Sequence, residues 1–151
     1  METKKVFFKG VLPVSLALTF FLSACSKSND NGYVLSGVAS STQEVPAIST
    51  PAGGSVTGTY DDKTHMLTYR VTWDALSGPA YMAHFHGPAD AGQNAKVLIP
   101  INITQTASGI ATGAVILADS VANFFKSGKM YYNVHSAQYP GGEIRAQVTL
   151  K

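Results

Sequence analysis

The residues with the clearest capacity for chemistry lie between positions 81 and 88, where two histidines are separated by one residue. If this stretch is a β-strand, its side chains alternate between faces, so Met82, His84 and His86 share one face. Tyr81 would lie on the opposite face. Two imidazoles on one strand face could bind a metal ion, form a hydrogen-bonded structural pair or contribute to a recognition surface.

A further histidine lies near the end of the chain, in the predicted strand 130–135. On that strand His135 shares a face with Tyr131 and Asn133. If the two strands are neighbours, His135 could approach the other two imidazoles. Three converging imidazoles would suit Cu(II) or Zn(II), and the methionine of the first strand would offer a soft ligand for Cu(I).

The alternative for these rings is structural. Neutral histidines donate and accept hydrogen bonds at once, so partly buried rings can tie strand ends to loop carbonyls. For His84, His86 and His135 we expect this structural role first, metal binding second and catalysis third. Glu143 is expected to pair with one of these rings or with Arg70.

No pair of residues predicts a catalytic mechanism. Ser136 directly follows His135, and adjacent strand residues point apart, so they form no nucleophile–base pair. We therefore assign no catalytic residue. His65 is isolated beside a turn and is expected at the surface.

The N-terminus has the character of a secretory signal. In residues 1–24 three lysines precede a short apolar run. Leu22-Ser23-Ala24-Cys25 resembles a bacterial lipobox, which implies cleavage before Cys25 and attachment of lipid to its sulfur. The polar segment 25–32 is expected to form a flexible tether.

The positive charge of the chain belongs to the predicted signal. The chain has 11 basic and 9 acidic residues. Three of the basic residues and one acidic residue lie in residues 1–24, which leaves eight of each sign in residues 25–151. A neutral mature chain without a basic cluster argues against nucleic-acid binding. Cys25 is the only cysteine, so the domain has no internal disulfide and must be held together by its core.

Residues 33–151 predict a single all-β domain. Seven or eight short strands, separated by glycine and proline turns, indicate an antiparallel β-sandwich. Asp119 is predicted to cap one short helix that ends before Gly128. The clearest two-residue alternation falls in the segment 65–73, where one face carries Leu67, Tyr69, Val71 and Trp73.

Three segments, in this order and spacing, resemble the CHRD domain, which is named for chordin and occurs widely in bacterial exported proteins. They are Gln43-Glu44-Val45-Pro46, then Ala83-His84-Phe85-His86-Gly87-Pro88, then Tyr132-Asn133-Val134-His135-Ser136 followed by Pro140-Gly141-Gly142-Glu143-Ile144-Arg145. The resemblance implies an immunoglobulin-like or superoxide-dismutase-like β-sandwich and no established catalytic activity. It also implies that a set of motif residues is structural: Glu44, Pro46, Gly87, Pro88, Asn133, Gly141, Gly142, Glu143 and Arg145.

The sequence therefore predicts a lipid-anchored module of the bacterial cell envelope, at the outer membrane or the cell surface. Its favoured role is non-catalytic binding or adhesion, with a protein or glycan ligand and no certain cofactor. The second interpretation is a copper- or zinc-binding envelope protein that uses His84, His86 and His135. A dismutase-like redox enzyme on the same histidines is the least favoured.

Overall fold

The computed structural model describes residues 1–2 and 32–151. The predicted cleavage site, Cys25 and nearly all of the predicted tether lie outside the described residues, so these remain predictions.

The described residues form mainly β-strands. In chain order the elements are β1 (Gly32–Ser40), the 3₁₀ turn η1 (Ser41–Gln43), β2 (Gly53–Asp61), β3 (Met66–Asp74), β4 (Ala80–His86), β5 (Val97–Pro100), β6 (Gly109–Ile116), the helix α1 (Asp119–Lys126), β7 (Met130–Ser136) and β8 (Ile144–Leu150).

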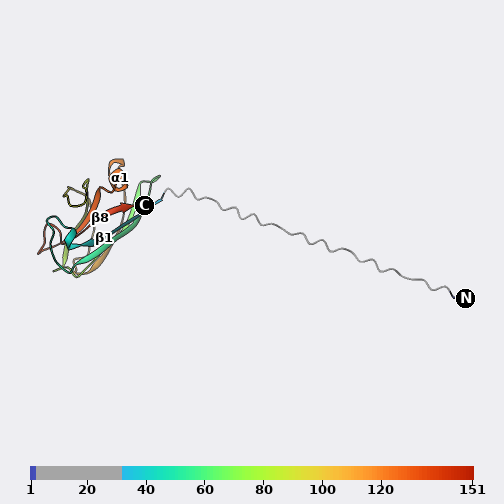
Figure 1. The fold of residues 1–151 in the computed structure, drawn as a ribbon, viewed down its shortest axis with the longest axis horizontal. Helices are drawn as coiled ribbons and strands as arrows, with labels where there is room; N and C mark the ends of the chain where they lie inside the picture. The colour runs from blue at the N-terminus through green and yellow to red at the C-terminus, as the bar shows by residue number, and fades with distance from the viewer. Residues whose placement is uncertain (3–31) are drawn as a thin grey trace.

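These strands pair in one antiparallel sheet of order β5-β4-β7-β8-β1-β2-β3-β6. The sheet curls where β8 and β1 run side by side, so that its two halves face each other (Figure 1). Tyr69 of β3 and Phe85 of β4 meet edge to face across the interior, with ring centroids 5.2 Å apart. This arrangement confirms the predicted all-β sandwich.

The alternation predicted for residues 65–73 is confirmed in β3. The side chains of Leu67, Tyr69, Val71 and Trp73 are all buried, because a half-buried strand sends alternate residues into the core. The preceding turn is held by Asp61, whose Oδ1 accepts hydrogen bonds from the backbone N–H groups of residues 63 and 64.

The single predicted α-helix is present, with one difference at its start. Asp119 is its first helical residue rather than its cap, and Ala118 occupies the cap position. A carboxylate in the first turn still favours the positive end of the helix dipole. The helix buries Ala122 and Phe125, and it ends before Gly128, whose φ of 68° suits glycine. Within the described residues no helix is long and apolar enough to cross a membrane.

Candidate functional site

Strand β7 is buried along its whole length. One face carries Tyr132 and Val134 into the apolar core. The other face carries Tyr131, Asn133 and His135. In an antiparallel sheet with one solvent-exposed face, side chains on that face contact water. Here these side chains are buried too. The sandwich therefore has a second, polar layer on the outer face of β4, β7 and β8.

The polar layer consists of buried side chains from three strands and one loop: Glu44, His86, Asn133, His135 and Arg145. The strand register brings them together, because β4 and β7 are neighbours. Met82 lies opposite His135, and His84 lies opposite Asn133.

The three histidines that the sequence singled out converge at one edge of the polar layer. One ring nitrogen from each of His84, His86 and His135 lies within 4.8 Å of the other two. Three atoms at such separations lie within about 2.8 Å of a common point (4.8 Å divided by √3), compared with about 2.0–2.1 Å for a zinc–imidazole bond. Shifts of roughly 0.7 Å would close the rings on an ion.

Two of the rings approach each other directly. Nδ1 of His84 lies 3.2 Å from Nε2 of His135. Nδ1 of His135 donates to the carbonyl oxygen of Pro140 at 2.9 Å, which leaves the lone pair of a neutral ring on Nε2. In the metal-free protein, Nδ1–H of His84 can therefore donate to Nε2 of His135.

The third ring is held more firmly. His86 lies flat on Tyr131, with centroids 4.7 Å apart and planes 3° from parallel. Its Nδ1 lies 3.1 Å from the carbonyl oxygen of Ala95, and its Nε2 lies 2.9 Å from Oδ1 of Asn133. A neutral ring has one N–H and satisfies one of these oxygens. With Nε2–H the ring donates to Oδ1 of Asn133, whose NH₂ faces the carbonyl oxygen of Gly141 at 3.4 Å, and with Nδ1–H it donates to Ala95 instead.

Burial favours the neutral form of all three imidazoles near pH 7. Burial lowers the pKa of His135 to about 4, although its hydrogen bond to Pro140 acts in the opposite direction. Burial also lowers the pKa of His84, and the neighbouring His86 adds to this effect. The pKa of His86 is lowered mainly by burial. Neutral imidazole is the form that binds metals.

Tyr81 differs from its predicted position. The register between β4 and β7 shifts between Ala80 and Met82, and such a bulge can turn consecutive side chains to one side. The Tyr81 ring consequently lies 6.2 Å from that of His135, and its hydroxyl group is 3.4 Å from the carbonyl oxygen of Pro140. Strict alternation had placed it on the opposite face.

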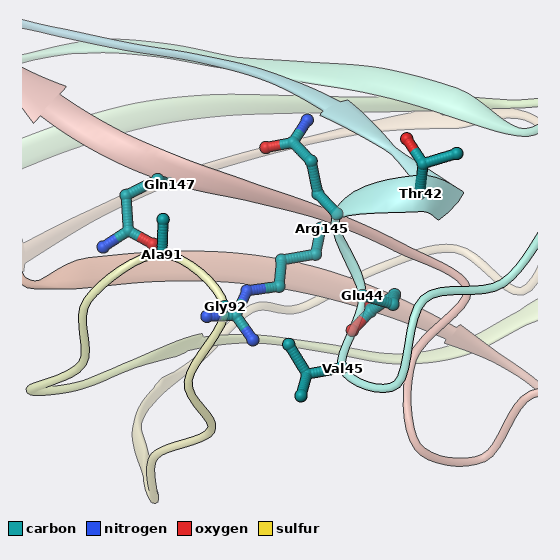
Figure 2. A pocket seen from close by; sticks show the side chains of 8 residues that line it. Thr42, Glu44, Val45, Ala91, Gly92, Arg145 and Gln147 are labelled. Atoms are coloured by element: carbon teal, nitrogen blue, oxygen red, sulfur yellow. The ribbon is translucent and has the colours of Figure 1, made fainter.

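The other end of the polar layer borders a pocket of about 200 Å³. Figure 2 shows Arg145 extending from β8 toward the loop of Ala91 and Gly92, with Glu44 beside it. The guanidinium of Arg145 lies 3.4 Å from the centre of the Tyr131 ring. Its Nη2 and Nη1 donate to the carbonyl oxygen of Gln93 and to Oδ1 of Asn94, so Arg145 fixes this loop over the strands.

Glu44 is the buried carboxyl group beside this arginine. Its side chain is 6 % exposed, and Oε1 has no hydrogen-bond partner among the described residues. Burial raises its pKa to about 7, against the opposing effect of the Arg145 charge. The motif resemblance had marked Glu44 as structural, but sequence alone gave no sign of its burial or its raised pKa.

The predicted partner of Glu143 was wrong. Its carboxylate contacts neither a histidine nor Arg70. Oε1 accepts hydrogen bonds from the backbone N–H and the hydroxyl group of Ser77, at 2.8 and 2.7 Å. Glu143 is fully buried, so it ties the β3–β4 loop to the start of β8. Nothing in the local pattern indicated Ser77.

Two of the remaining motif residues, Gly87 and Gly142, stand where the backbone passes close to other side chains. A side chain at Gly87 would collide with Met130, and one at Gly142 would collide with Glu44 and Asn133. Pro46 and Pro88 follow cis peptide bonds, and Pro46 and Gly141 line a second pocket beside Tyr139. His65, the fourth histidine, is not part of the histidine cluster. Its Nδ1 lies 3.1 Å from Oδ1 of Asp119, and its side chain is partly exposed, as predicted.

Comparison with known proteins supports the family resemblance. The family model described as the CHRD domain matches residues 35–148, which include β2 to β7 and most of β1 and β8. No curated protein and no solved structure matches the chain.

Proposed function

The chain belongs to the CHRD domain family, and we propose that it is a non-catalytic binding module of the bacterial cell envelope whose ligand is a transition-metal ion. His84, His86 and His135 hold the ion. The family supports the coarser statement, a β-sandwich module with a binding role. The histidine geometry favours a metal as the ligand over a protein or a glycan.

The observation that carries this proposal is the 3.2 Å separation between Nδ1 of His84 and Nε2 of His135. Two ligand nitrogens bound to one ion at about 2.0–2.1 Å, with a near-tetrahedral angle, lie about 3.3 Å apart. The two atoms therefore already have the spacing of a chelating pair.

The surroundings of the rings support the same role. Metal-bound histidines commonly donate their second ring N–H to a carbonyl or carboxylate oxygen, which fixes the ring and its tautomer. His135 has such a bond to Pro140, and His86 has a matching contact with Ala95. Both rings are thereby oriented before an ion arrives.

Binding also requires no costly proton loss. All three rings are neutral near pH 7, because burial lowers each pKa. His84 moves its proton from Nδ1 to Nε2, which frees Nδ1 for the ion and releases no proton to solvent.

The test is a calorimetric titration of residues 26–151, which contain every described strand and helix, with Cu(II) and with Zn(II). We expect about one ion per chain and loss of binding in the His84→Ala/His86→Ala and His135→Ala variants. The matched control is His65→Ala, which removes the histidine paired with Asp119 and should leave binding unchanged. Equal heats from the wild type and the His84→Ala/His86→Ala variant would refute the metal site.

The envelope location rests on the lipobox resemblance at Cys25 and is tested separately. In the full-length chain Cys25→Ser should move the protein from the membrane fraction to the soluble fraction. Unchanged retention in the membrane fraction would show that the anchor lies elsewhere.

A further inference from the structure

Three imidazoles can bind either zinc or copper, so the preference of the site for one metal depends on the other side chains that could act as ligands. This inference rests on the proposed metal site and concerns its selectivity. Zinc generally takes four ligands in a tetrahedral arrangement, whereas soft sulfur ligands select Cu(I).

The cluster is poor in ligands that zinc would add. Among the described residues the group of candidate ligands holds three histidines and no carboxylate or thiolate. The nearest buried acid of the polar layer, Glu44, lies on the far side of Asn133, next to Gly142 and Arg145. His86 is in addition already engaged with Ala95 and Asn133.

The cluster does have a sulfur neighbour. Met82 lies directly opposite His135 in the β4–β7 ladder, where Cβ atoms are about 4.5–5.5 Å apart. It is two residues from His84, and so it belongs to the same face of β4. Met82 is 38 % exposed, so its flexible thioether has room to turn toward the neighbouring rings.

We propose that the site selects copper, and that Met82 supplies the thioether that binds Cu(I) together with His84 and His135. Two imidazoles and one soft thioether form a three-coordinate set of neutral ligands. His86 keeps its position between Ala95 and Asn133 in this state and joins the ion as a further imidazole in the Cu(II) state.

The experiment measures Cu(I) affinity by competition with bicinchoninate under anaerobic conditions, and Zn(II) and Cu(II) affinity by calorimetry, on residues 26–151. The variant is Met82→Leu, which keeps side-chain volume at an exposed position and removes the sulfur. The matched control is Met66→Leu, a change of the same kind on β3.

We expect Met82→Leu to weaken Cu(I) binding at least tenfold and to leave Zn(II) and Cu(II) binding within twofold of the wild type. Met66→Leu should change none of the three. X-ray absorption of the Cu(I)-loaded wild type should show one sulfur neighbour that is lost in Met82→Leu.

Unchanged Cu(I) affinity in Met82→Leu would overturn the role of Met82 and leave the histidine site standing. Zn(II) binding as tight as Cu(I) binding in the wild type would overturn the selection of copper. A wild type that binds none of the three ions would overturn the histidine site itself, and with it this inference.

Discussion

Replacing Glu44 with glutamine tests the electrostatics of the polar layer without disturbing its shape. The carboxyl group is buried beside Arg145, and its pKa rises from 4.5 to about 7 because burial outweighs the attraction of the guanidinium. Glutamine has nearly the same volume and cannot ionise. A difference in stability between the wild type and Glu44→Gln that varies with pH therefore reports the charge of Glu44.

The sign follows from the proton count. Between pH 4.5 and 7 the folded chain keeps a proton on Glu44 that the unfolded chain has lost. Stability of the wild type therefore falls through this window as pH rises. A shift of about 2.5 pKa units corresponds to about 3 kcal/mol. The free energy of unfolding of Glu44→Gln, relative to that of the wild type, should therefore rise by about 3 kcal/mol between pH 4 and pH 8.

His135 produces the opposite slope. Its folded pKa is lowered from 6.5 to about 4, so the unfolded chain binds a proton first, and stability is lost as pH falls from about 6.5 toward 4. In the wild type this slope opposes that of Glu44, and the lowered pKa values of His84 and His86 add to it. In Glu44→Gln the histidine slope is no longer opposed by Glu44, so the stability of the variant should rise with pH.

Urea unfolding between pH 4 and pH 8 measures this difference. Trp73 is the only tryptophan and is 1 % exposed, so its fluorescence reports the unfolding of the core. The matched control is Asp74→Asn at an exposed position. A stability difference between the wild type and Glu44→Gln that stays constant over this pH range would refute the raised pKa of Glu44.

Three further changes test other contacts. Gly142→Ala should destabilise the fold by about 1–3 kcal/mol in urea unfolding. The φ of Gly142 is 129°, and the new methyl group would overlap the carboxylate of Glu44. The control is Gly141→Ala, which has open space around it and should change the urea midpoint little. Glu143→Ala should cost about 2–4 kcal/mol in the same assay, because it removes a fully buried side chain together with its two hydrogen bonds to Ser77. Metal affinity, measured by calorimetry, should stay constant from pH 8 to about 6.5 and fall in acid, because the lowered imidazole pKa values delay competition by protons. A steep loss of metal affinity already between pH 8 and 7 would show that the imidazoles are not neutral in this range.

Local periodicity was sufficient to predict the strands and the faces of several site residues. Alternation placed His84 and His86 on one face of β4, and Asn133 and His135 on one face of β7, and the structure has them there. It failed at Tyr81, because a bulge interrupts the alternation and depends on the pairing of two strands rather than on either strand alone.

The contacts between distant segments could not be predicted in the same way. The register that sets Met82 opposite His135 depends on the strand order of the whole sheet. Ser77 reaches Glu143 from a loop, and loops have no period that reveals their course. The polar face of β7 would ordinarily face water, and its burial follows from loops that fold over it, which include the loop fixed by Arg145.

The most direct test of the proposed function is the position of a bound copper ion. Crystals of residues 26–151 grown with copper should show an anomalous-difference peak about 2 Å from both Nδ1 of His84 and Nε2 of His135. No peak at this pair, or copper found only at His65, would contradict the proposal that these histidines form the metal site.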